Sequence, residues 1–193
     1  MTENPLYARL KANLSSPVIL IGMMGTGKTA LAKKLAEKIG QQAIDIDSEI
    51  VKRAGLTIPE IFEKHGEESF RRLEFDVLES ILNAAKEQGA CPIIATGGGI
   101  VTVPECAALI KKGGVSVWLK ADLDHLAARL ALDKSRPMLE GAENVKARLT
   151  ELMRVREPLY AAADITFVTH QEPLYKTVPL LAEALLAHFD AGA

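Results

Sequence analysis

The sequence is poor in cysteine and has no strong excess of either charge. Its two cysteines, Cys91 and Cys106, stand fifteen positions apart without a CxxC or Cys/His cluster, so they offer neither a disulfide framework nor a metal-binding signature. We interpret both as small buried side chains in a reducing compartment. The 23 basic and 25 acidic residues leave a formal net charge of -2, whereas nucleic-acid-binding modules normally carry a basic excess. These counts argue against a nucleic-acid partner.

Long apolar runs are also missing. No stretch approaches the roughly 18 apolar residues that a membrane span needs, and residues 1–16 contain Glu3 and lack the apolar segment of a secretory signal. A cytoplasmic protein without a membrane partner is therefore expected. We interpret residues 1–16 as an N-terminal extension, 17–189 as a single domain and 190–193 as a tail.

Short apolar runs alternate with amphipathic helical patterns along this domain. The expected strands are 18–21, 43–46, 92–96, 115–119 and 165–169. The expected helices are 28–39, 71–88, 104–111, 122–131, 143–156 and 173–189, with Pro158 ending the fifth because proline lacks the helical N–H. Strands separated by helices predict βαβ crossovers and a parallel sheet. Residues 48–70 and 132–142 fit the alternation poorly, and we expect a substrate-binding region and a mobile lid there.

The clearest motif lies at residues 22–29, where GMMGTGKT matches GxxxxGK[ST] between a buried strand and an amphipathic helix. Glycines let backbone N–H groups turn inward around an anion, and the start of a helix adds a favourable dipole. Lys28 is expected to reach the β- and γ-phosphates of a nucleotide, and the Thr29 hydroxyl is expected to bind Mg²⁺. An ordinary glycine-rich turn is the alternative.

Two aspartates, Asp45 and Asp47, stand at the end of the second expected strand. Residues two apart on a strand point the same way, with Cα atoms roughly 6.6 Å apart. Asp45 could then hold Mg²⁺ while Asp47 orients or deprotonates an acceptor hydroxyl. Alternatively, Asp47 or Ser48 simply caps the following helix. The complete phosphate loop favours the functional interpretation, because open α/β sheets bind ligands at the carboxyl ends of their strands.

A second glycine run, residues 97–99, follows the buried run 93–96. Three residues without side chains indicate either a close backbone approach to another group or a tight turn. If this strand neighbours the first, its N–H groups face the γ-phosphate and the acceptor.

Arginines stand near loops or helix ends in three segments. Arg71 lies beside an apolar helical stripe, with Glu74 placed to fix its guanidinium; Arg136 lies in the expected lid, and Arg156 near the end of the next helix. Guanidinium pairs bidentately with carboxylate and phosphate, which favours an anion-binding role. Solvated surface arginines are the alternative.

Together, the blocks GMMGTGKT, DID, GEESFRRLE, TGGG, SRPML and RVREPLY resemble the shikimate kinase family, from residue 18 to about residue 169. The resemblance implies an α/β, P-loop NTPase-type three-layer α/β/α fold with a five-stranded parallel sheet of order 2-3-1-4-5. It also implies a substrate-binding helical region at about 48–83 and a lid at about 129–142. The implied activity is ATP-dependent phosphorylation of the 3-hydroxyl of shikimate in aromatic amino-acid biosynthesis. Met138 replaces the leucine expected after Arg-Pro, a change that an apolar lid position should tolerate.

The resemblance also implies the roles of individual residues. The catalytic residues would be Lys28, Asp47 and Arg136. ATP would be bound by Gly25, Thr26, Gly27, Lys28, Thr29, Ala30, Arg129 and Arg136, with Arg129 against adenine and the contacts near His170 left open. Shikimate would be bound by Asp47, Phe62, Phe70, Arg71, Gly97, Gly98, Gly99 and Arg156, and Mg²⁺ by Thr29 and Asp45.

Two other kinds of function compete with this one. A P-loop kinase for gluconate or a nucleoside monophosphate would share the phosphate loop, but the arginines and the acid pair fit a hydroxylated carboxylate better. A non-catalytic nucleotide-binding regulator would be expected to lack Lys28, Asp47 or Arg136, and all three are present. We expect a monomer whose partners are ATP and shikimate.

Overall fold

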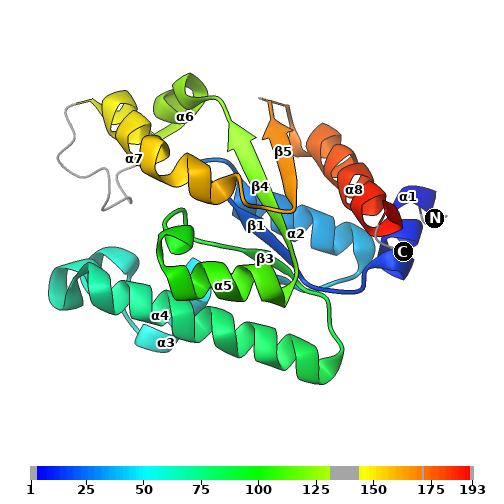
Figure 1. Cartoon of the computed structure of the whole chain (residues 1–193), viewed down its shortest axis with the longest axis horizontal. Helices are drawn as coiled ribbons and strands as arrows, with labels where there is room; N and C mark the ends of the chain where they lie inside the picture. Colours follow the sequence, from blue (N-terminus) through cyan, green and yellow to red (C-terminus); the bar gives the residue numbers. More distant parts are fainter. Residues whose placement is uncertain (1–3, 131–143, 171, 192–193) are drawn as a thin grey trace.

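The protein has a five-stranded parallel sheet at its centre (Figure 1). The structure is a computed structural model and describes residues 4–130, 144–170 and 172–191. The strands are β1 (Val18–Ile21), β2 (Ala43–Asp45), β3 (Ile93–Ala95), β4 (Val115–Ala121) and β5 (Ile165–Thr169). Their order is β2-β3-β1-β4-β5, so the predicted sheet is confirmed. Because every pairing is parallel, the carboxyl ends of all five strands lie at the same edge.

Helices cover both faces of the sheet (Figure 1). One layer is formed by α1 (Pro5–Asn13), α2 (Lys28–Ile39) and α8 (Leu174–Ala191). The other is formed by α3 (Ile46–Ala54), α4 (Ile58–Gln88), α5 (Pro104–Gly113), α6 (Leu123–Leu130) and α7 (Val145–Tyr160), with a short 3-10 helix at Ile100–Thr102. Strand β1 contributes to both cores: Val18 and Leu20 pack on the first layer, while Ile19 and Ile21 pack on the second. Among the helices that the structure describes, none is long and apolar enough to cross a membrane.

The expected N-terminal extension contains a capped helix. The Asn4 side chain accepts a hydrogen bond from the backbone N–H of Leu6, and Pro5 occupies the first turn, where its missing N–H costs nothing. Tyr7 and Leu10 are buried in the core that α1 shares with α8. This packing brings the two ends of the described chain side by side (Figure 1).

Strand β2 is one residue shorter than predicted, and this moves the acid pair. Asp45 ends the strand and caps α3, with its Oδ1 accepting the N–H of Ser48 at 2.9 Å. Asp47 therefore lies in the first turn of a helix. The prediction that both aspartates stand at the end of a strand and point the same way was wrong, because Asp45 is an N-cap and the helix starts at the next residue.

The prediction that Pro158 ends its helix was also wrong. Helix α7 continues to Tyr160, and the N–H of Ala161 still donates to the Glu157 carbonyl at 2.9 Å. A proline in the last turn deprives only one carbonyl, that of Arg154, of its helical partner. As a result Arg156 and Tyr160, one turn apart, both lie on the buried face of α7.

Helix α4 begins earlier than the predicted 71–88. It starts with a capping box between Thr57 and Glu60 and changes direction at Gly66, whose φ of 78° and ψ of 174° are not helical. The poorly fitting residues 48–70 therefore belong to α3 and the first part of α4, at the carboxyl edge of the sheet.

Candidate active site

The phosphate loop joins β1 to α2, as predicted. Gly22, Gly25 and Gly27 have φ values of 137°, 81° and 88°, which L side chains rarely adopt. At Gly22 a Cβ would also lie 2.7 Å from the Leu119 carbonyl oxygen. Lys28 is buried, and its ammonium donates to the carbonyls of Gly22 and Met23, both at 2.8 Å. The loop therefore holds the ammonium group at the start of α2.

Two oxygen-bearing side chains meet beside this loop. The hydroxyl of Thr29 donates to Oδ2 of Asp45 at 2.5 Å, while Oδ1 of Asp45 caps α3. A hydroxyl and a carboxylate are ligand types that Mg²⁺ accepts when a nucleotide and water supply the rest. The donor set thus fits a magnesium ion.

An arginine pocket opens next to the loop. It is lined by Met24, Asp47, Ile58, Phe62, Phe70, Arg71, Glu74, Gly97, Gly98, Gly99 and Arg156. Every residue predicted to bind shikimate is in this set. The rings of Phe62 and Phe70 lie 4.8 Å apart, so the pocket combines an apolar wall with two guanidinium groups.

The two arginines are held differently. Arg71 donates to Glu74 at 2.5 Å and to Glu67 at 2.7 Å, which fixes its guanidinium as the sequence predicted for Glu74. Arg156 is only 4% exposed, and its Nη1 contacts the Met23 sulfur at 3.8 Å. No carboxylate in the described part of the chain forms an ion pair with it. The carboxyl of Glu74 is close enough for Arg156 to lower its pKa, but a buried guanidinium that forms no direct ion pair favours the binding of an anionic ligand.

Glu74 is fully buried between charged groups. The pKa of its carboxyl is raised to about 7, chiefly by burial and also by the nearby Asp47, while the guanidiniums of Arg71 and Arg156 act in the opposite direction. Its Oε1 has no hydrogen-bond partner among the described residues. Burial therefore outweighs the ion pair at this carboxyl.

The glycine run lies against these charged groups. A Cβ at Gly97 would lie 2.5 Å from Glu74 Oε1, and one at Gly99 would lie 2.5 Å from Arg71 Nη2. Strand β3 is the direct neighbour of β1, and the Thr96 hydroxyl donates to the Leu20 carbonyl at 3.0 Å. The glycines are therefore explained by close approach as well as by the turn.

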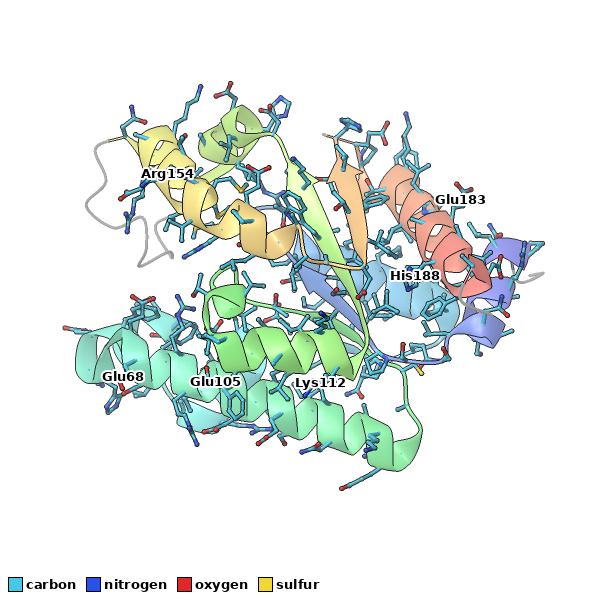
Figure 2. The ribbon with its side chains drawn as sticks, in the orientation of Figure 1. Glu68, Glu105, Lys112, Arg154, Glu183 and His188 are labelled. Carbon is cyan, nitrogen blue, oxygen red and sulfur yellow. The ribbon has the colours of Figure 1, made fainter. Side chains whose placement is uncertain are left out.

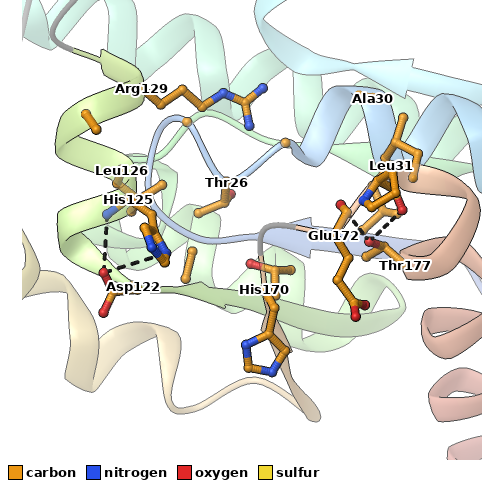
Figure 3. Close-up of a pocket in the computed structure, with 17 residues that line it drawn as sticks. Thr26, Ala30, Leu31, Asp122, His125, Leu126, Arg129, His170, Glu172 and Thr177 are labelled. Carbon is orange, nitrogen blue, oxygen red and sulfur yellow. Dashed lines mark hydrogen bonds and ion pairs between the residues drawn. The ribbon is translucent and has the colours of Figure 1, made fainter.

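A large pocket of about 550 Å³ lies on the other side of the phosphate loop (Figure 3). The residues that line it are Gly25, Thr26, Gly27, Ala30, Leu31, Ala121, Asp122, His125, Leu126, Ala128, Arg129, Thr169, His170, Glu172, Pro173, Leu174 and Thr177. The Arg129 guanidinium extends over the loop, with Nη1 4.0 Å from where a Cβ on Gly27 would be. Sequence reasoning missed Asp122, His125, Glu172 and Thr177. Only their position in the sequence, after the carboxyl ends of β4 and β5, could have indicated that they line a pocket.

A central pocket of about 290 Å³ joins the other two. It shares Gly25, Gly27, Ala30 and Arg129 with the large pocket, and Met24, Asp47 and Gly98 with the arginine pocket. Lys28 and Thr29 also line it. The three pockets therefore form one path along the carboxyl edge of the sheet, with the phosphate-loop lysine and Asp47 in its middle.

One predicted arginine, Arg136, and one further arginine, Arg154, remain outside this path. Arg136 and most of the expected lid lie outside the described residues. Arg154, labelled in Figure 2, lies on the exposed side of α7, two residues from the buried Arg156.

Comparison with known proteins identifies this arrangement. The family model described as "Shikimate kinase" matches residues 24–185. The chain belongs to the shikimate kinase family. A shikimate kinase from Bradyrhizobium diazoefficiens is 38% identical over 189 residues, covering 95% of this chain and 88% of the relative. One from Thioalkalivibrio sulfidiphilus is 43% identical over 165 residues, covering 85% and 84%.

Solved structures agree with the family assignment. The structure of a shikimate kinase from Acinetobacter baumannii in complex with shikimate has a TM-score of 0.83 and 34% identity, covering 95% of this chain and 98% of that one. A gluconokinase from Sinorhizobium meliloti has a TM-score of 0.51 at 17% identity, covering 93% and 94%. That likeness shows the fold alone, so gluconate gains no support from it over shikimate.

Proposed function

We propose that the protein transfers the γ-phosphoryl group of ATP to the 3-hydroxyl of shikimate. The observation that carries the proposal is the buried guanidinium of Arg156, which faces a pocket that also contains Arg71 and Asp47 and adjoins the phosphate loop. Shikimate carries a carboxylate and several hydroxyls, and these groups match two guanidiniums and one acid. Membership of the shikimate kinase family supports the same substrate.

In this proposal the two ends of the path hold the two substrates. Arg71 and Arg156 bind the shikimate carboxylate, Phe62 and Phe70 pack on its ring, and the backbone at 97–99 lies against it. The phosphate-loop residues Gly25–Ala30 bind the ATP phosphates, while Arg129 lies against adenine at the entrance of the large pocket. The two reacting groups then meet in the central pocket.

Catalysis requires alignment and charge stabilisation more than covalent work by the protein. Asp47, which lines both the central and the arginine pocket, orients the acceptor hydroxyl and can accept its proton. The Lys28 ammonium offsets charge on the transferring phosphoryl group. When bound, Mg²⁺ would neutralise charge on the phosphate oxygens, and Thr29 and Asp45 would hold it. Arg136 as a lid arginine, a cytoplasmic location and a monomeric state stay predictions.

An acceptor panel tests the proposal. ADP release is measured with Mg²⁺ and ATP in the presence of shikimate, shikimate methyl ester, gluconate or a nucleoside monophosphate. We expect rapid turnover with shikimate and poor turnover with the ester, because the ester lacks the charge that Arg71 and Arg156 bind. Faster turnover with gluconate or a monophosphate would reject shikimate as the substrate, and ATP binding without turnover of any acceptor would indicate a regulator.

A further inference from the structure

The carbonyl oxygen of Gly98, the central residue of the glycine run, accepts a hydrogen bond from a residue on a distant helix. The donor is the hydroxyl of Tyr160 at the end of α7. The other two carbonyls of the run accept bonds from close along the chain: that of Gly97 from the N–H of Ile100, and that of Gly99 from Thr102. Among the described residues, Tyr160 therefore makes the one hydrogen bond that joins these carbonyls to another element.

Such a bond matters because three successive glycines have little stiffness of their own. Glycine loses more conformational freedom on ordering than any other residue, and it has no side chain to pack. The run nevertheless lies close to Glu74 and Arg71, since a Cβ at Gly97 or at Gly99 would lie 2.5 Å from an atom of these side chains. A fixed donor to Gly98 would keep the backbone in that position.

Tyr160 is itself firmly placed. Its side chain is fully buried, and its ring stacks on Trp118 of β4 with centroids 5.9 Å apart and planes at 25°. Burial raises the pKa of its phenol to about 12, so the hydroxyl keeps its proton and stays a donor at neutral pH. A tyrosine ring has few torsions to order, which makes it a rigid support.

The same helix turn carries Arg156. Residues four apart lie on one face of a helix, and both side chains are buried on that face. One rigid element therefore presents a guanidinium to the arginine pocket and a hydroxyl to the glycine run that forms the pocket's other wall. This arrangement exists because α7 continues through Pro158.

We infer that Tyr160 is a positioning residue, which sets the separation between Arg156 and the glycine run and thereby the affinity for the acceptor. It does not line the arginine pocket itself, and it acts through the Gly98 carbonyl and the neighbouring Arg156 guanidinium. The inference rests on the proposed function where it names shikimate as the acceptor. The claim that Tyr160 holds the glycine run rests on the geometry alone.

The test is Tyr160→Phe, which removes only the hydroxyl. Loss of one buried hydrogen bond is expected to raise the shikimate KM about five- to tenfold. The ATP KM and kcat should change less than about twofold, because the phosphate loop is untouched. Tyr7→Phe, at a buried tyrosine of α1 remote from the site, is the matched control and should leave both KM values unchanged. A shikimate KM within twofold of the original, or an equal rise in both KM values, would overturn the inference.

A second measurement needs no substrate. Hydrogen–deuterium exchange of a peptide covering 96–102 should be faster in Tyr160→Phe, while peptides from α1 and α2 should be unchanged. If this peptide exchanged at the same rate in Tyr160→Phe and in the original protein, Tyr160 would not hold the glycine run in place. Failure of the unmutated protein to phosphorylate shikimate would instead reject the proposed function, so the two ideas fail separately. A thermal melt of each variant identifies general unfolding, which would accelerate exchange in all peptides alike.

Discussion

The arginine pocket and the large pocket share one sheet edge but are built from different kinds of side chain. In the arginine pocket the charges are buried: Glu74 is fully covered and Arg156 is 4% exposed. In the large pocket the charged or polar residues Asp122, His125 and Arg129 are exposed. Buried charges cost free energy unless they are paired or meet a ligand, whereas exposed charges are screened by water. Under the proposed function, specificity for the acceptor is therefore built into the folded protein, while nucleotide binding depends on the phosphate loop and on weaker contacts.

The largest effect is expected where the two sides meet. Lys28→Ala should lower kcat roughly 10²–10³-fold, since it removes a preorganised charge at the transferring phosphoryl group. Steady-state ADP release measures it, with Lys38→Ala on the exposed side of α2 as control. Near-normal turnover in Lys28→Ala would show that the lysine takes no part in the reaction. The central pocket would then not be the place where the two substrates react.

The buried carboxyl of Glu74 allows the arginine pocket to be tested through the pH dependence of stability. Because the pKa of Glu74 is raised from 4.5 to about 7 in the folded protein, its contribution to stability is full below pH 4.5 and is lost as the pH rises through about 7. The free energy of unfolding of the original protein, relative to Glu74→Gln, should fall by about 3 kcal/mol over this range. Urea unfolding at pH 4.5 to 8 measures it.

The exposed Glu79 on the same helix supplies the control, because Glu79→Gln should not alter the pH profile. A profile for Glu74→Gln parallel to that of the original protein would mean that the buried carboxyl is ionised throughout, as an exposed one would be. The contrast between the two pockets would then be weaker than the burial indicates.

Arg156→Lys tests whether the arginine pocket and the large pocket bind different substrates. Lysine keeps the charge but lacks the planar fork, so we expect the shikimate KM to rise about 10- to 100-fold with the ATP KM unchanged. Arg154→Lys, on the exposed side of the same helix, should change neither value. If the ATP KM rose instead, Arg156 would belong to the nucleotide side and the assignment of the arginine pocket would be wrong.

The smallest effect is expected in the large pocket. Arg129→Ala removes an exposed cation from the proposed adenine contact, and such contacts contribute about 0.5–1 kcal/mol, so the ATP KM should rise only about two- to fivefold. The shikimate KM at saturating ATP should not change. If Arg129→Ala raised the ATP KM as much as Arg156→Lys raises the shikimate KM, the exposed charges of the large pocket would contribute as much to binding as the buried charges of the arginine pocket.

Apolar runs separated by helical patterns predicted a parallel sheet from a clear physical cause, whereas the strand order came from the family resemblance. The glycines at 22–29 predicted a phosphate loop, and those at 97–99 left a close backbone approach or a tight turn open; both explanations hold in the structure. Family resemblance then added the residues from α4 and α7. All eight predicted acceptor-binding residues line one pocket.

The failures have local causes. Asp45 could extend a strand or cap a helix, and only the hydrogen bond to Ser48 decides between them. The prediction that Pro158 ends its helix failed because a proline in the last turn of a helix costs one hydrogen bond at most, and packing can offset that loss. Glu172 and His125 stand alone beyond strand ends, with no pattern around them, so only the fold brings them to the large pocket. Tyr160 ends the RVREPLY block, but no role was predicted for it, because its hydrogen-bond partner Gly98 is 62 positions away.

The chain contains one tryptophan, Trp118, and it stacks on the ring whose hydroxyl reaches the glycine run. Its indole is almost fully shielded from solvent, and the ammonium of Lys120 lies 4.8 Å from the ring centroid. Excitation at wavelengths that tyrosine does not absorb therefore selects a single indole, and its neighbour Tyr160 is bonded to the glycine run of the proposed acceptor site. We expect its emission to change when an acceptor binds there, which would follow binding with no dye, tag or coupled assay.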